Sequence, residues 1–164
     1  MHIELRKLRV VAALSEETAC YTAEVWIDGV RSFAASNRGH GGADDYHRLG
    51  SVTEAEVNAW LRANRTARVY RGVTLEPSLE HEVAHLMDVA EQTKAMRRKL
   101  RTSVMTIESD TVYTYPLRGN SPAAVIAAIR KAKPDADVLN DGDEAVITRA
   151  VELLLAQDDA ADGS

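Results

Sequence analysis

The chain has 164 residues, of which 45% are hydrophobic and 5% aromatic, and its formal net charge is −5 at pH 7. A chain of this length can bury one substantial core, here built from Leu, Val, Ile and Ala because aromatic residues are scarce. The acidic balance argues against broad electrostatic binding to nucleic acid or anionic lipid. The single cysteine, Cys20, excludes an internal disulfide and fits a reducing cytosol, and neither a signal peptide nor a membrane-spanning apolar run is evident. We expect a cytoplasmic protein with one domain over residues 1–157 and a disordered acidic tail over residues 158–164.

The first elements show the alternation of an antiparallel meander. Apolar residues alternate in part over residues 2–14 and clearly over residues 20–27. Asp28-Gly29 then predicts a two-residue hairpin, because a type I′ turn needs positive φ at both positions. A returning strand over residues 30–36 completes a three-stranded meander.

A glycine-rich segment follows, over residues 37–47. Three glycines in four residues allow backbone conformations that other residues avoid, and they can expose N–H groups to an anion. The segment matches neither the P-loop nor the dinucleotide-binding spacing. It is either an irregular loop that leaves a strand or a binding loop for a ligand or partner. The candidate binding residues are Asn37, Arg38, Gly39, His40, Gly41, Gly42, Asp44 and Asp45.

The rest of the chain alternates between helical and strand patterns. Thr53 and Glu56 form a capping box, and Ser121-Pro122 is an efficient helix start. The expected elements are a helix over 53–63, a strand over 68–75, a long helix over 76–101, a hairpin of strands 103–108 and 111–115, a helix over 122–133, a short strand over 137–139 and a last helix over 143–156. This order predicts an α+β fold with an N-terminal antiparallel meander, a long central amphipathic helix, a second hairpin and two C-terminal helices.

The long helix carries the strongest catalytic motif of the sequence, His81-Glu82-Val83-Ala84-His85. H-E-x-x-H on a helix places two imidazoles one turn apart on one face, beside a carboxylate that can act as general base of a zinc peptidase. A catalytic zinc needs a third protein ligand, and no histidine follows His85. The third ligand would have to be an acid such as Asp88, which helical geometry places on the same face.

The long helix also has two simpler interpretations. An apolar stripe indicates a scaffold helix whose histidines lie on its solvated face. The basic residues at its end complement the helix dipole, although they could also form a patch that binds a partner. The stripe comprises Leu79, Val83, Leu86, Met87 and Ala90, and the basic patch comprises Lys94, Arg97, Arg98 and Arg101.

The alternating strand of residues 21–30, followed by Ser36-Asn37-Arg38-Gly39-His40-Gly41-Gly42, resembles a group of small uncharacterised bacterial, plasmid and phage proteins. In that group an N-terminal hairpin leads into an N-x-G-x-G-G loop. A charged helix ending in Lys and Arg and then a hairpin follow, here residues 94–115. The similarity covers roughly residues 5–140. The resemblance implies no activity and no catalytic residue.

We therefore expect a non-enzymatic binding protein of bacterial or mobile-element origin, without a cofactor. Its partner would be a protein or a small ligand, and it could modulate a host system from the host cytoplasm if a phage encodes it. The glycine-rich segment is the expected contact surface. The alternative is a small zinc-dependent metallopeptidase, with His81, His85 and Asp88 around the metal and Glu82 as general base.

Overall fold

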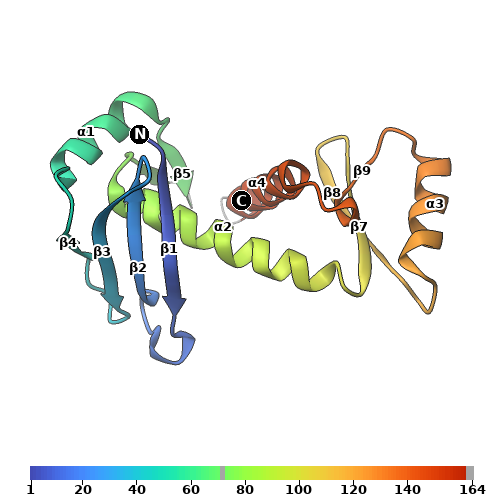
Figure 1. Ribbon diagram of the computed structural model, residues 1–164, viewed down its shortest axis with the longest axis horizontal. Coiled ribbons are helices and arrows are strands. Elements are labelled where there is room, and N and C mark those ends of the chain that lie inside the picture. The colour runs from blue at the N-terminus through green and yellow to red at the C-terminus, as the bar shows by residue number, and fades with distance from the viewer. Residues whose placement is uncertain (71–72, 162–164) are drawn as a thin grey trace. The chain divides into compact units, whose positions relative to one another are not determined.

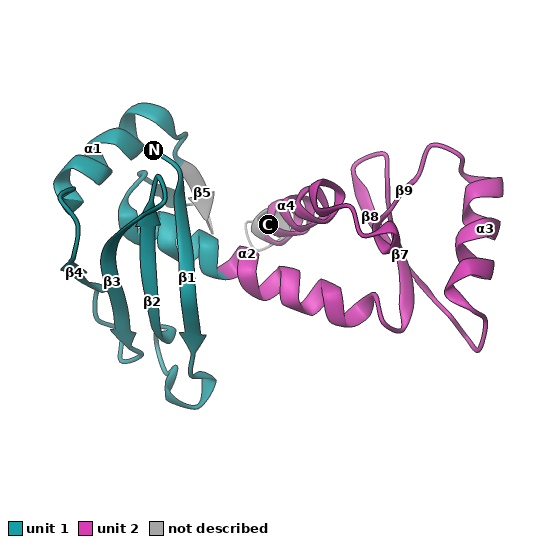
Figure 2. Ribbon diagram, viewed as in Figure 1, with its two compact units in different colours: residues 1–87 teal, residues 88–164 magenta. Residues whose placement is uncertain are grey.

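The computed structural model describes residues 1–70 and 73–161 (Figure 1). The chain forms two compact units, residues 1–87 and residues 88–164 (Figure 2). Both units mix helices and strands, which confirms the α+β class expected from the sequence. A single domain over residues 1–157 stays a prediction, because two compact units can unfold either together or separately.

The first unit is built on a four-stranded antiparallel sheet in the order β1-β2-β3-β4. Its strands are β1 (Ile3–Val10), β2 (Cys20–Ile27), β3 (Val30–Arg38) and β4 (Asp45–Arg48). The predicted hairpin joins β2 to β3, with φ of 50° at Asp28 and 78° at Gly29. The meander has one strand more than the sequence indicated, because the end of the glycine-rich segment pairs with β3, as Tyr46 does with Ala35.

One face of this sheet carries the core of the first unit. Val25 and Phe33, from the two central strands, pack there with apolar residues of two helices, α1 (Glu54–Asn64) and the first half of α2 (Leu79–Lys99). The expected capping box is present, since Thr53 and Glu56 bond reciprocally at the start of α1. Between the helices, two antiparallel strands, β5 (Arg68–Tyr70) and β6 (Val73–Leu75), replace the single strand that the sequence predicted.

The second unit contains a three-stranded antiparallel sheet in the order β8-β7-β9. Its elements are β7 (Ser103–Glu108), β8 (Thr111–Pro116), α3 (Pro122–Ala132), β9 (Asp137–Val138), a short 3-10 helix η2 (Leu139–Asp141) and α4 (Glu144–Ala161). Four consecutive residues of β7, 104–107, are buried, as in a central strand covered on both faces. Met105 and Ile107 pack with α4 and the second half of α2, whereas Val104 packs with α3.

The two cores explain why the predicted stripe of α2 is only partly buried. Leu79 and Val83 are fully buried in the first core, and Leu86 and Met87 pack against it. Ala90 is exposed, in contrast to the prediction. Beyond residue 87 the helix belongs to the second unit, where Met96 supplies the buried contact instead.

The last helix is longer than the sequence indicated. α4 continues to Ala161, so residues 158–161 are helical although they were assigned to the acidic tail. Residues 162–164 of that predicted tail lie outside the described residues. Within the described part of the chain, no helix is long and apolar enough to cross a membrane.

Candidate binding surface at one end of the first sheet

The glycine-rich segment folds against the connection between β1 and β2. Because β3 ends at Arg38 and β4 begins at Asp45, the loop itself spans residues 39–44. The carbonyl of Gly39 accepts hydrogen bonds from the backbone N–H groups of Glu16 and Glu17, at 3.0 and 3.1 Å. We call residues 10–18, which include the short 3-10 helix η1 (Ala12–Leu14), together with residues 39–44 the tip.

Close packing requires glycine at the centre of the tip. Gly39 is buried and has a φ of 88°. A Cβ at this position would lie 2.1 Å from the carbonyl oxygen of Leu14, far inside contact distance. A Cβ at Gly41, with φ of 82°, would meet the movable carboxylate of Glu17 at 2.2 Å. The loop and the β1–β2 connection can therefore approach closely only because Gly39 has no side chain.

Asn37 joins the parts of the tip through its side-chain amide. Its Nδ2 donates to the carbonyl of Gly42 and to Oδ1 of Asp44, both at 2.9 Å. Its Oδ1 accepts from Thr18 Oγ1 at 2.9 Å and from the N–H of Gly39 at 2.8 Å. All four bonds are within the protein, so Asn37 holds the loop rather than presenting a free group to a ligand.

Asp44 anchors the loop to the sheet. Its Oδ2 accepts from the phenol of Tyr21 at 2.6 Å and from that of Tyr46 at 2.8 Å. Burial raises the pKa of both phenols, and the bonds to Asp44 raise them further, so both tyrosines remain donors. Asn37 and Asp44 thus stabilise the conformation of the predicted binding loop.

Two backbone N–H groups of the loop are used within the protein. The N–H of Gly39 is directed at Asn37, and the N–H of Gly41 donates to Thr18 Oγ1 at 3.3 Å. These donors are therefore already satisfied inside the protein. The exposed members of the predicted site are Arg38, His40, Gly41, Gly42 and Asp45.

Three apolar residues of the tip are exposed to solvent, and the sequence interpretation did not include them. Val10, Val11 and Leu14 keep 52, 43 and 54% of their surface exposed. They belong to a run of five apolar residues, 10–14, in which the alternation of β1 breaks down. That break is the sequence signal that could have identified them, because a strand with one buried face would place polar residues between apolar ones.

The histidine motif lies in the first half of α2, in the first unit. His81 and His85 are half-buried, and His81 Nδ1 lies 2.7 Å from the carbonyl of Glu76. Glu82, the candidate general base, forms an ion pair with Arg65 at 3.2 Å. Among residues 1–70 and 73–161, no three or more His, Cys, Asp and Glu side chains form a group that could hold a metal. The third ligand that a zinc peptidase requires is thus not brought to the motif within the described residues.

The predicted basic patch lies in the second unit. The guanidinium of Arg97 makes two hydrogen bonds to the carboxylate of Glu144, at 2.9 and 2.7 Å. This contact joins α2 to the start of α4. Lys94, Arg98 and Arg101 are exposed. One cation of the four therefore has a structural role within the unit.

The chain matches no protein-family model, no curated protein and no solved structure. Its function is therefore inferred from the contacts, burial and charges of its own residues.

Proposed function

We propose that the chain is a non-enzymatic binding protein that engages another protein through the tip of its first sheet. The observation that carries this proposal is the exposure of Val10, Val11 and Leu14 on a segment fastened to the glycine loop. Exposed apolar side chains that gather on one surface mark protein-interaction sites. The partner accordingly presents an apolar surface of its own, which the tip covers on binding.

The tip is also held in one conformation before any partner arrives. The Gly39 carbonyl, the Asn37 amide and the Asp44 carboxylate each bond to more than one group. Association is weakened by the entropy lost when a flexible loop becomes ordered, so a preorganised loop binds more tightly for the same contacts. The glycine-rich sequence therefore supports binding by shaping the surface rather than by contacting a ligand through its backbone.

Exposed polar side chains also lie on the tip and next to it in the chain. His40 Nδ1 lies 3.1 Å from Glu16 Oε2, and Arg38 and Asp45 are exposed beside the loop. An apolar centre with a polar rim is the usual anatomy of a protein interface. This arrangement favours a protein surface over a small anion as the partner of the tip.

The proposal includes a cytoplasmic location and needs no cofactor. The single cysteine, Cys20, supports a reducing compartment. An origin in a bacterium or mobile element, with a host protein as partner, is supported by the resemblance of the N-terminal hairpin and its N-x-G-x-G-G loop.

The test compares a double substitution in the tip with a matched substitution elsewhere. Val11→Asp with Leu14→Asp should abolish the apolar centre without unfolding the protein, because both side chains are exposed. Val30→Asp is the control, since Val30 is 60% exposed at the β2–β3 turn, outside the tip. Each protein is cross-linked in a lysate of the source cells, and the captured proteins are quantified by mass spectrometry.

We expect a protein that the wild type and Val30→Asp capture equally and that the double variant captures about tenfold less, as for the loss of central interface residues. Sedimentation of the purified proteins shows whether a second copy is that partner. Identical captured proteins for all three chains would reject the tip as the contact surface.

A further inference from the structure

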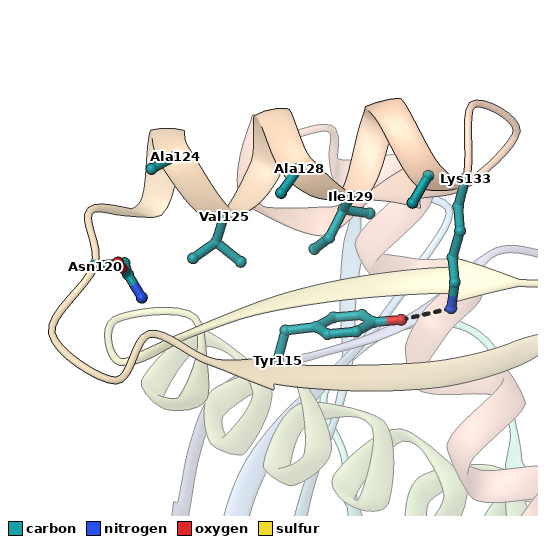
Figure 3. Close-up of a pocket in the computed structure, with 8 residues that line it drawn as sticks. Tyr115, Asn120, Ala124, Val125, Ala128, Ile129 and Lys133 are labelled. Carbon is teal, nitrogen blue, oxygen red and sulfur yellow. Dashed lines mark hydrogen bonds between the residues drawn. The ribbon is translucent and has the colours of Figure 1, made fainter.

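A groove of about 440 Å³ lies between α3 and β8 in the second unit. Figure 3 shows the ring of Tyr115 beneath α3, with Val125 and Ile129 pointing from the helix toward it. Asn120 lies at one end of the groove and Lys133 at the other. The volume falls within the range of small-molecule sites, about 300–1,000 Å³.

The groove exists because one side of α3 carries very small side chains. Ala124, Ala128 and Ala132 recur every fourth residue, so they lie above one another along the helix and all line the groove. At a rise of about 1.5 Å per residue, this row spans about 12 Å. An elongated apolar ligand can lie along the row, between the alanine methyl groups and the ring of Tyr115.

Lys133 places its ammonium at one end of the groove, where it forms an ion pair with Glu108. Its Nζ donates to Glu108 and, at 2.8 Å, to the phenol oxygen of Tyr115. It also lies 5.2 and 5.5 Å from the ring centroids of Tyr113 and Tyr115. A lysine normally loses much side-chain freedom when it binds a ligand, but here these contacts already restrict it.

The carboxylate beside Lys133 is satisfied by the protein. Glu108 Oε1 accepts from Thr106 Oγ1 at 2.7 Å and from the Tyr115 phenol at 2.6 Å, while Lys133 bonds to its other oxygen. Its side chain is only 14% exposed, whereas that of Lys133 is 47% exposed. An ammonium has three N–H donors, and these contacts use two of them. The third can serve an acceptor at the end of the groove.

We propose that this groove binds a medium-chain aliphatic carboxylate. The alkyl chain lies along the alanine row against Tyr115, and the carboxylate accepts the remaining N–H of Lys133. A charge-assisted hydrogen bond to an ammonium is about twice as strong as a neutral one, so the carboxylate is preferred to an uncharged head group. This site is independent of the tip, so either proposal can fail without the other.

The test titrates the full-length protein with sodium octanoate and, separately, with 1-octanol, followed by calorimetry and by backbone amide NMR shifts. We expect saturable octanoate binding, shifts concentrated on α3 and β8, and about tenfold weaker binding of the alcohol. Absence of saturable octanoate binding, or equal affinity for the alcohol, would overturn the proposal.

Two matched pairs of variants locate the site. Ala128→Leu fills the groove and should weaken octanoate binding about tenfold, while Ala127→Leu, at an exposed helix position outside the groove, should not. Lys133→Met should remove the preference for octanoate over octanol, while Lys131→Met should retain it. If Lys133→Met unfolds the protein, the alanine pair decides. Equal effects of Ala128→Leu and Ala127→Leu would reject the groove as the site.

Discussion

Replacing Gly39 by alanine should destabilise the protein far more than the same replacement at Gly29. Both glycines have left-handed φ angles, 88° and 78°, so alanine costs about 1–2 kcal/mol of backbone strain at either position. A Cβ at Gly29 would meet nothing within 4 Å. A Cβ at Gly39 would lie 2.1 Å from the carbonyl oxygen of Leu14 and 3.0 Å from the Cβ of Cys20. Gly29→Ala is thus a control that isolates the steric part of the effect.

The size of the stability loss in Gly39→Ala depends on how far the Leu14 carbonyl must be displaced. The 2.1 Å contact has to lengthen by roughly 1 Å, and the atom in the way belongs to the backbone of Leu14, which cannot rotate aside as a side chain can. Moving it strains the hydrogen bonds that the Gly39 carbonyl accepts from Glu16 and Glu17, each worth about 1 kcal/mol. We therefore expect a loss of about 3–4 kcal/mol for Gly39→Ala, against about 1–2 kcal/mol for Gly29→Ala.

Urea denaturation followed by circular dichroism measures both losses as free energies of unfolding. Hydrogen exchange at the amides of Glu16 and Glu17 gives a local readout, because these amides should lose protection in Gly39→Ala and keep it in Gly29→Ala. Equal free-energy losses at the two positions, with unchanged protection of both amides, would contradict the packing of Gly39 against Leu14.

Two charged clusters of the first unit lead to separate predictions. A double-mutant cycle with Glu82→Gln and Arg65→Met should give a coupling energy of about 0.5 kcal/mol, as for a partly exposed ion pair. Metal analysis of protein purified without an affinity tag tests the peptidase alternative, which stoichiometric zinc would support. Hydrogen bonds from Lys7 and then Trp26 lower the pKa of Glu24 below 4.5, so its contribution to stability is present above pH 4.5 and is lost as the pH falls through the lowered value. As the pH falls below 4.5, the free energy of unfolding of Glu24→Gln should therefore decrease less than that of the wild type, as measured by urea denaturation. An equal decrease in both proteins would contradict this assignment.

The sequence alone determined the features that depend on neighbouring residues. Asp28-Gly29 specifies its hairpin because the turn is closed within four residues. The capping box of Thr53 and Glu56 specifies the start of α1 for the same reason. Alternating and helical patterns gave the second hairpin and the order of helices, from which the α+β class follows.

The candidate site was only partly predictable. The sequence drew attention to the glycine-rich segment, but it did not show that Asn37 and Asp44 would be used to hold the loop. Nor did it show that the loop would pack against the segment that carries the exposed residues Val10, Val11 and Leu14. A glycine-rich sequence shows that the loop can adopt unusual backbone conformations. It does not show that the loop will form hydrogen bonds with the β1–β2 connection.

Tertiary structure alone decided which distant segments meet. The Gly39 carbonyl binds residues of the β1–β2 connection, and Lys133 meets Glu108, which lies 25 residues earlier in the chain. It also decided that α2 serves two cores, which leaves Ala90 exposed although it continues the apolar stripe. Periodicity records which face of an element is apolar, but not which element covers that face. That choice depends on how the helices and strands pack together, and this packing created both the tip and the groove.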